Sequence, residues 1–249
     1  MRYFIQLAYN GTNYHGWQKQ PNGITVQEKL DFCLSKLLGK EIETLGCGRT
    51  DTGVHATDFF AHFDGDSEIE NLEDLKFRLN RFLPNDIVVK KIIKVADDFH
   101  ARFDAQWREY EYWMTFNKNV FLADRTLHLN TKLNIQAMKE AAEILLEYED
   151  FQCFSKVHTE VNNFRCKIHL AEFELREEVL VFKIRANRFL RNMVRAIVGT
   201  LMEVGKENLT LSDFRKVIES KDRKEAGTSI DAKGLHLTKV EYNFKDTYL

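Results

Sequence analysis

The segment NLEDLKFRLNRFLPNDIVVKKIIKV, residues 71–95, predicts a helix followed directly by a strand. Asn71 is a favourable helix cap, and apolar side chains recur behind it at helical spacing, at Leu72, Leu75, Leu79 and Phe82. Pro84 ends the helix, because proline cannot continue it. The β-branched run DIVVKKIIKV then predicts the strand. One such pair fits many folds, so the order of the surrounding elements determines the class.

The residues before this segment complete a βαββαβ order. They predict a strand over residues 2–9, a helix over 26–39, and strands near 41–45 and 57–63. Thr25 and Glu28 have the spacing of a capping box at the start of that helix. The first half of the chain is therefore expected to form one βαββαβ unit.

The second half repeats this order. It predicts strands over residues 106–116, 164–175, 179–186 and 235–244, with helices over 135–147 and 188–204. An additional short helix near Leu211–Ser220, capped by Thr210, precedes the last strand. Two such units predict an α+β fold of two ferredoxin-like halves, each an antiparallel sheet with its helices on one face. We place the halves at residues 1–103 and 104–249, joined tightly near residues 97–104.

The composition indicates a folded protein. The chain has 249 residues, of which 44% are hydrophobic and 12% aromatic, enough for one large or two modest cores. The start MRYFIQLAYN alternates polar and apolar residues, and no uncharged stretch reaches membrane-spanning length. We therefore expect a soluble, cytoplasmic protein with no membrane segment. The net charge of −2 argues against nonspecific coating of nucleic acid but allows a local basic groove.

The cysteines do not indicate a metal site. Neither a CxxC pair nor a Cys/His cluster at zinc spacing is found among the four, which are Cys33, Cys47, Cys153 and Cys166. We expect reduced thiols, two of them in the core.

The segment GCGRTDTGVHA, residues 46–56, contains the tripeptide of aspartic proteases. No apolar strand precedes it, no second D-[TS]-G occurs, and 249 residues are too many for the minimal protease protomer, so a protease dyad is improbable. For such a spacing alone, a turn in which Asp51 bonds to the backbone is the favoured interpretation. Arg49 can instead hold this carboxylate ionised for catalysis. His55 suits a bond to loop backbone and a catalytic role about equally.

Two further groups of residues are candidates for a site. Arg188, Arg191 and Arg195 fall at i, i+3 and i+7 of the predicted helix, either as a solvated flank or as a row facing phosphates or a carboxylate. In the strand QWREYEYWMTF, one face carries Tyr110, Tyr112 and Met114, and the other carries Glu109, Glu111 and Trp113. A strand tyrosine usually packs in a core, but at a cleft it could stack on a base.

Five blocks of the sequence together resemble the TruA family of tRNA pseudouridine synthases. They are, in chain order, YNGTNYHGWQKQPN, GRTDTGVHA, DDFHARFDA at 97–105, NRFLRNMVRAIVGTLMEVG at 187–205 and AGTSIDAKGLHL at 226–237. The blocks stand in the family's order and run from residue 9 to residue 237, so the resemblance covers nearly the whole chain.

The resemblance implies an enzyme that isomerises uridine to pseudouridine at tRNA positions 38 to 40, in the anticodon stem-loop, without metal or other cofactor. It implies the pseudouridine synthase fold with a central active-site cleft, and a homodimer that holds tRNA across both protomers. Asp51 matches the catalytic aspartate, which attacks the nucleoside or, by a competing proposal, removes a sugar proton.

The resemblance also implies roles for other residues. Arg49 would contact the flipped nucleotide or its phosphate, Tyr110 would stack on the uracil, and Arg195 would pair with the catalytic carboxylate. Leu235 lies in the block that lines the pocket, and Arg188 and Arg191 are candidates for binding RNA.

A few positions depart from the family pattern. Thr52 stands where alanine is usual, Glu109 where a basic residue is common, and Ile230 and Asp231 in a stretch that often carries proline. Glu109 should face away from Tyr110, with little effect on chemistry, although it could weaken local contacts with the RNA backbone. The alternative of a noncatalytic protein built from paired RRM-like halves lacks the aromatic RNA-binding pattern of such modules.

Overall fold

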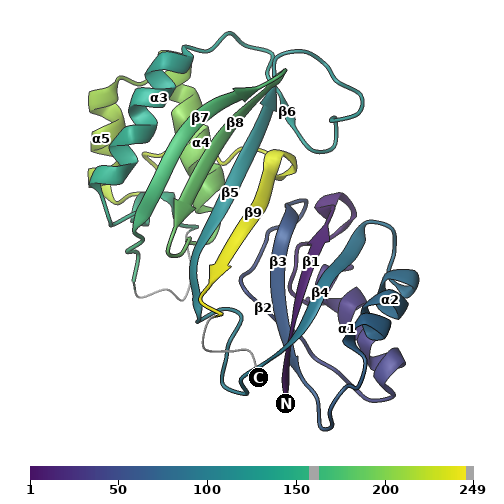
Figure 1. Cartoon of the computed structure of the whole chain (residues 1–249). Helices are drawn as coiled ribbons and strands as arrows, with labels where there is room; N and C mark the ends of the chain where they lie inside the picture. Colours follow the sequence, from purple (N-terminus) through teal and green to yellow (C-terminus); the bar gives the residue numbers. More distant parts are fainter. Residues whose placement is uncertain (157–162, 245–249) are drawn as a thin grey trace. The chain divides into compact units, whose positions relative to one another are not determined.

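The computed structural model describes residues 1–156 and 163–244. Contacts divide the chain into two compact units: Met1–Gln106 together with the residues from Leu237 onward, and Trp107–His236. The α+β class with antiparallel sheets is confirmed in both (Figure 1). The contacts group most of the last strand with the first unit, whereas the division expected from the sequence counts it with the second half.

The first unit is built around its N-terminal strand. In the order β4-β1-β3-β9, the strands are β1 Arg2–Tyr9, β3 His55–Asp64, β4 Ile87–Val95 and β9 Leu235–Tyr242. β1 runs antiparallel to both β3 and β4, and Phe4 lies opposite His62 on one side and Ile93 on the other. One face of β1 is buried at Tyr3, Ile5, Leu7 and Tyr9, and Phe4 is buried on the other face. This strand is therefore the centre of the first core.

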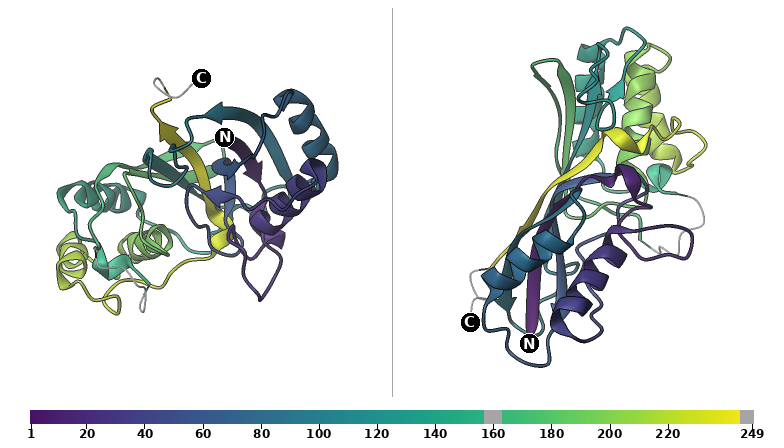
Figure 2. Two further views of the ribbon diagram at one scale, coloured as in Figure 1. Left: turned by 90° about the horizontal axis from the view of Figure 1, so that it is seen from below. Right: turned by 90° about the vertical axis from the view of Figure 1, so that its right-hand side faces the viewer.

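Two helices pack against this sheet as the sequence predicted. They are α1 Val26–Leu38 and α2 Leu72–Phe82 (Figure 1, Figure 2). Thr25 accepts a hydrogen bond from the Glu28 amide, and Asn71 accepts one from the Asp74 amide, so both predicted caps are in place. The apolar faces of the helices are buried at Leu30, Leu34, Leu75 and Leu79.

The strand predicted near residues 41–45 is almost absent, since only Leu45–Gly46 pairs with β3, as β2. Side chains of α1 bind the backbone that a strand partner would otherwise have bound. The Thr44 amide donates to Asp31 Oδ1 at 3.0 Å, and the Ile42 amide donates to Ser35 Oγ at 2.8 Å. The prediction was wrong because these partners come from a helix rather than from a neighbouring strand.

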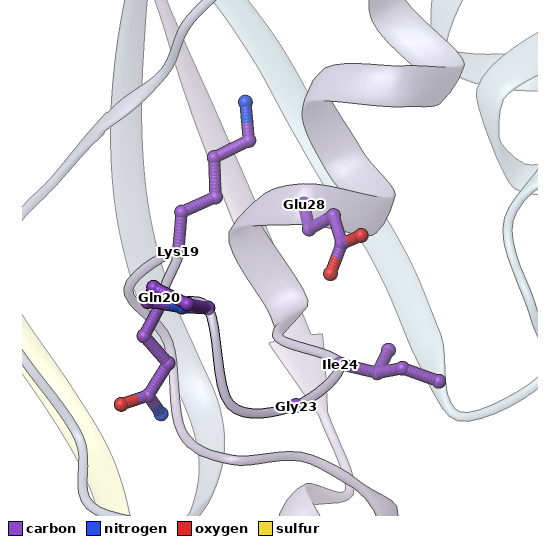
Figure 3. Close-up of a pocket in the computed structure, with 6 residues that line it drawn as sticks. Lys19, Gln20, Gly23, Ile24 and Glu28 are labelled. Carbon is purple, nitrogen blue, oxygen red and sulfur yellow. The ribbon is translucent and has the colours of Figure 1, made fainter.

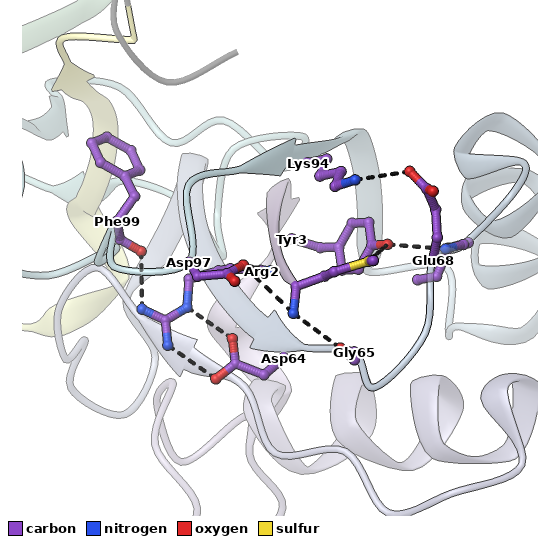
Figure 4. Close-up of polar contacts among 10 residues, drawn as sticks. Arg2, Tyr3, Asp64, Gly65, Glu68, Lys94, Asp97 and Phe99 are labelled. Carbon is purple, nitrogen blue, oxygen red and sulfur yellow. Dashed lines mark hydrogen bonds and ion pairs between the residues drawn. The ribbon is translucent and has the colours of Figure 1, made fainter. Parts of the chain in front are cut away.

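A network around Arg2 fixes the segment that follows β4 (Figure 4). The Arg2 guanidinium donates to both carboxylate oxygens of Asp64, at 2.8 and 2.9 Å, and to the Phe99 carbonyl at 3.3 Å. The Arg2 amide donates to Asp97 Oδ1 at 3.1 Å. The bidentate bond to Arg2 lowers the pKa of the Asp64 carboxyl. Residues 97–105, one of the conspicuous sequence blocks, are therefore tied to the first unit.

The second unit has the strand order β5-β8-β7, with antiparallel neighbours. Its strands are β5 Ala105–Thr115, β7 Ile168–Arg176 and β8 Val179–Ala186, and the short β6 Leu127–His128 runs parallel to β5. Three helices lie together on one face of these strands: α3 Ile135–Ile144, α4 Met193–Gly205 and α5 Leu211–Ser220 (Figure 1, Figure 2). α5 begins at a complete capping box of Thr210 and Asp213.

Two predicted helix boundaries in this unit were wrong. The helix expected over 135–147 ends at Ile144 and continues as one 3₁₀ turn, Leu145–Glu147. The helix expected from residue 188 begins only at Met193, because Asn192 has a left-handed backbone with φ of 67°. Arg188 and Arg191 therefore lie before α4, and the predicted row of three arginines on one helix does not exist.

All four cysteines are free and buried, so the expectation of only two core thiols was wrong. Burial raises the pKa of the Cys153 thiol to about 12 and that of Cys166 to about 11. Among the described residues, no helix is long and apolar enough to cross a membrane. The same residues contain no cluster of three or more potential metal ligands from His, Cys, Asp and Glu.

Candidate active site

The loop that carries Asp51 lies between β2 and β3 in the first unit, and the backbone itself fixes it. The Val54 amide donates to the Asp51 carbonyl at 3.1 Å, closing a turn around the aspartate. The Gly53 amide donates to the Tyr14 carbonyl at 3.2 Å, and Gly53 has a φ of 79° that favours glycine. The turn is thus tied to the segment that follows β1, about forty residues earlier in the chain.

Two glycines in that earlier segment allow it to contact the Asp51 loop. A Cβ on Gly11 would lie 1.9 Å from the Val54 carbonyl oxygen, and a Cβ on Gly16 would lie 2.2 Å from the Thr50 carbonyl oxygen. No side chain fits at either distance. The blocks YNGTNYHGW and GRTDTGVHA, which are separate in the sequence, are therefore the two sides of one backbone-to-backbone contact.

Aromatic side chains support this contact from the core. The rings of Trp17 and Phe59 stack with centroids 4.1 Å apart, and both residues are nearly fully buried. The hydroxyls of Tyr9 and Thr50 share a hydrogen bond of 2.9 Å. The turn around Asp51 consequently rests on a rigid, buried base.

The predicted residues of this loop differ in exposure. Asp51 is partly buried, whereas Arg49 and Thr52 are exposed. His55 is only 3% exposed, and its Nδ1 accepts a hydrogen bond from the Gly11 amide at 3.1 Å. Of the two interpretations left open for His55, the structure therefore shows the bond to loop backbone.

A cavity of about 630 Å³ lies in the same unit, formed by Lys19, Gln20, Pro21, Gly23, Ile24 and Glu28. Figure 3 shows Lys19 and Gln20 on one side of it and Ile24 and Glu28 on the other. Lys19 also pairs with the buried Asp31 at 3.0 Å, and this bond raises the pKa of the Lys19 amine. None of the residues predicted for the site belongs to this lining.

In the second unit, the face of β5 predicted to carry Tyr110, Tyr112 and Met114 is confirmed. Tyr112 and Met114 are fully buried, and the Tyr112 hydroxyl donates to the Asp231 carbonyl at 2.7 Å. Burial raises the pKa of the Tyr112 phenol far above its usual value. Tyr110 is only partly buried, so of these residues it is the one that can meet a ligand.

Phe189 supports Tyr110. The two rings meet edge to face, with centroids 5.1 Å apart and planes at 89°. Sequence reasoning missed Phe189, although it lies in the block NRFLRN; the only signal was its position beside the arginines. This contact constrains the orientation of the ring that the resemblance assigns to uracil stacking.

The opposite face of β5 carries ion pairs between two buried glutamates and partly exposed arginines. Glu109 accepts two hydrogen bonds from Arg185 of β8, at 2.9 and 2.5 Å, and the Arg185 guanidinium lies 4.4 Å from the Trp107 ring centroid. Glu111 accepts two from Arg176 of β7, at 2.8 and 2.7 Å. Glu109 thus faces away from Tyr110, and its charge is neutralised within the sheet.

Arg195 lies in the first turn of α4. Its Nε donates to the Ile230 carbonyl at 2.7 Å, and the Ile230 amide donates to the Arg195 carbonyl at 3.3 Å. One nitrogen of the guanidinium is therefore anchored to a loop, residues 226–231, and this fixes the direction of the group. Leu235 follows that loop at the start of β9 and is 6% exposed.

The loop 226–231 packs tightly on α4. A Cβ on Gly199 would lie 1.9 Å from the Thr228 carbonyl oxygen, and a Cβ on Gly227 would lie 2.9 Å from the Thr200 backbone. The Gly227 amide donates to Thr200 Oγ1 at 2.9 Å. Glycines again permit a close backbone contact. This contact holds the loop whose Ile230 carbonyl accepts the hydrogen bond from Arg195.

The two remaining predicted residues lie in the segment before α4. The Arg188 amide donates to Asn187 Oδ1 at 2.9 Å, and the Arg191 carbonyl accepts a hydrogen bond from the Lys156 amide at 3.1 Å. Arg188 is partly buried and Arg191 is exposed. They belong to the same unit as Arg195 but do not share its helix.

Comparisons with known proteins give a consistent family. A family model described as tRNA pseudouridine synthase matches residues 6–104 and 141–243. The chain is 51% identical over 242 residues to tRNA pseudouridine synthase A of Bacteroides fragilis, covering 97% of this chain and 96% of that protein. It is 50% identical over 241 residues to the protein of that name from Azobacteroides pseudotrichonymphae, covering 97% of this chain and 96% of that protein. It is 39% identical over 239 residues to the protein of that name from Acetivibrio thermocellus, covering 95% of this chain and 97% of that protein.

Proposed function

The chain belongs to the tRNA pseudouridine synthase family, and from this membership we propose that it isomerises uridine to pseudouridine in tRNA. We propose positions 38, 39 and 40 of the anticodon stem-loop as its targets. The observation that carries the proposal is the Asp51 turn, whose backbone is fixed by the contacts of Gly11 and Gly16. A carboxylate on so rigid a turn suits chemistry that depends on position.

The substrate must first be extruded from its stem. C1′ and C6 of a paired, stacked uridine cannot be reached, so the nucleotide has to flip out at a cost of a few kcal/mol. Stacking on an aromatic ring returns roughly 1 to 3 kcal/mol, and we propose Tyr110 for this role because it is the partly buried tyrosine on its face of β5. We propose that Arg188 and Arg191, with Arg49, bind phosphates of the flipped strand.

The reaction rearranges bonds without any external reactant. The C1′–N1 bond breaks, the uracil rotates while held, C5 bonds to C1′, N1 gains a proton and the C5 proton is lost to solvent. We propose Asp51 as the catalytic group, either as the nucleophile at the nucleoside or as the base that removes a sugar proton. We propose that Arg195 and Asp51 act on the same uridine, with the guanidinium keeping the carboxylate ionised, and that Leu235 contributes apolar surface that excludes water.

We further propose a cytoplasmic homodimer, following the family resemblance. Light scattering of the purified protein should give twice the mass of one chain. A monomer that retains full activity would contradict this part of the proposal.

The function itself is tested by mapping the product. Unmodified tRNA transcripts, incubated with the protein, should acquire carbodiimide-dependent stops of primer extension at positions 38 to 40. tRNA from cells that lack the gene should have no such stops, and the gene should restore them. Transcripts without stops, in a reaction where the protein is folded, would refute the proposed function.

A further inference from the structure

Arg223 contacts three atoms of the loop that anchors Arg195. Its Nη1 donates to the carbonyls of Ala226 and Gly227, at 3.2 and 3.1 Å, and its Nη2 donates to Ser229 Oγ at 2.8 Å. Asn192, directly before α4, donates to the same hydroxyl. One planar guanidinium thus fastens the loop at three points, a geometry that arginine provides and lysine does not.

The loop that Arg223 binds is itself hydrogen-bonded to Arg195. Ile230 follows Ser229 directly, and its carbonyl accepts the hydrogen bond from Arg195 Nε while its amide donates to the Arg195 carbonyl. Close packing leaves the loop little freedom, since Gly199 and Gly227 have no room for a Cβ. A shift of residues 226–229 would therefore move the Ile230 carbonyl and turn the Arg195 guanidinium with it.

Arg223 is itself held in place. It follows α5, where Lys221 has a left-handed backbone with φ of 55° and Asp222 accepts hydrogen bonds from the amides of Lys224 and Glu225. Arg223 is partly buried, so its bonds to the loop are partly shielded from water. The contacts therefore form a continuous chain from the end of α5 to the start of α4.

We propose that Arg223 is a positioning residue for Arg195 and acts on the isomerisation only through it. This inference rests on the proposed role of Arg195. Loss of Arg223 leaves two carbonyls and a hydroxyl without their shared donor and loosens the loop. Small misplacements of a catalytic group can cost up to about 100-fold in rate. The effect should therefore be on turnover rather than on tRNA affinity.

The first test compares Arg223→Ala and Arg223→Lys with Arg215→Ala. Arg215 is a suitable control because it lies in α5, also forms a bidentate contact, with Glu147, and does not contact the loop. For both Arg223 variants we expect kcat for tritium release from C5-labelled tRNA to fall at least about tenfold, with KM changed less than about threefold. Arg215→Ala should keep the kcat of the wild type, even if its melting temperature falls as much as those of the Arg223 variants.

The second test combines Arg223→Lys with Arg195→Lys under single turnover. If Arg223 acts through Arg195, the double variant should be about as slow as Arg195→Lys alone. Equal fold losses in the two backgrounds would overturn the proposal, as would an unchanged kcat in a folded Arg223→Ala protein. A wild-type protein without tritium release would instead refute the proposed function, so the two failures are distinguishable.

Discussion

At the residue scale, the contact between Gly11 and the Asp51 turn leaves no room for a side chain at residue 11. A backbone carbonyl, that of Val54, occupies the space where a Cβ on residue 11 would lie. Gly48 is in the same loop as Asp51 but has nothing within 4 Å of its own Cβ position. Of these two glycines near the proposed catalytic group, Gly48 has room for a side chain and Gly11 has none. Substituting each by alanine therefore gives a variant and its matched control.

Gly11→Ala should displace the Asp51 turn, while Gly48→Ala should not. We expect Gly11→Ala to destabilise the protein by roughly 1–3 kcal/mol, the usual cost of overpacking, and to lower activity more than its stability predicts. Urea unfolding and tritium release measure the two effects. Equal stability and activity in the two variants would contradict the contact that the structure shows.

A buried histidine in the same unit should make the stability of the protein depend on pH. His62 is 1% exposed, its Nδ1 accepts a hydrogen bond from the Ala101 amide at 3.1 Å, and its ring lies 4.7 Å from that of His100. Burial, with a smaller contribution from the charge of Arg2, lowers the pKa of His62 from 6.5 to about 4, against the opposite influence of Asp64.

The direction in which stability changes with pH follows from the number of protons that the folded and unfolded chains bind. Between the unfolded pKa of 6.5 and the folded pKa of about 4, the unfolded chain binds more protons at His62, so stability is fully present above pH 6.5 and falls as the pH is lowered. The loss by pH 4 should be on the order of 3 kcal/mol. Urea unfolding at a series of pH values from 7 to 4 measures this loss. His62→Gln should flatten the curve, and an unchanged slope would show that other groups dominate.

At the scale of elements, periodicity and capping residues were sufficient to predict most of the fold. Helical spacing and a capping residue gave α1, α2 and α5 their bounds, because these signals lie within the element itself. The start of α4 could not be predicted, because it depends on Asn192 and on a hydrogen bond between the Lys156 amide and the Arg191 carbonyl, residues distant in sequence. The position of Asp51 in a turn was predictable, but the packing of Val54, at the end of that turn, against Gly11 was not.

The segment before α4 offers a prediction about RNA. Arg188→Glu and Arg191→Glu should weaken tRNA binding and reduce the slope of log K against log salt concentration by about one for each phosphate that is no longer neutralised. kcat at saturating tRNA should change little. Filter binding at several salt concentrations measures the slope. An unchanged slope would exclude these arginines from the RNA-binding surface.

At the scale of the whole molecule, the proposed chemistry draws on both units. Asp51 belongs to the first unit, and Tyr110 and Arg195 belong to the second. Contacts within each unit hold its proposed catalytic residue in place. In the first unit, close backbone contacts at glycines fix the turn around Asp51, and in the second unit, the loop 226–231 binds Arg195. A net charge of −2 gives no general attraction for RNA, so binding must come from local groups such as the arginines.

The central claim is that the carboxylate of Asp51 carries the reaction, and one measurement tests it most directly. tRNA transcript tritiated at uridine C5 is incubated with the wild-type protein and with Asp51→Asn, and the released tritium is followed while tRNA affinity is measured in parallel. The wild type should release tritium, and the variant should release none while binding tRNA within a few fold of the wild type. Substantial release by Asp51→Asn would contradict the account.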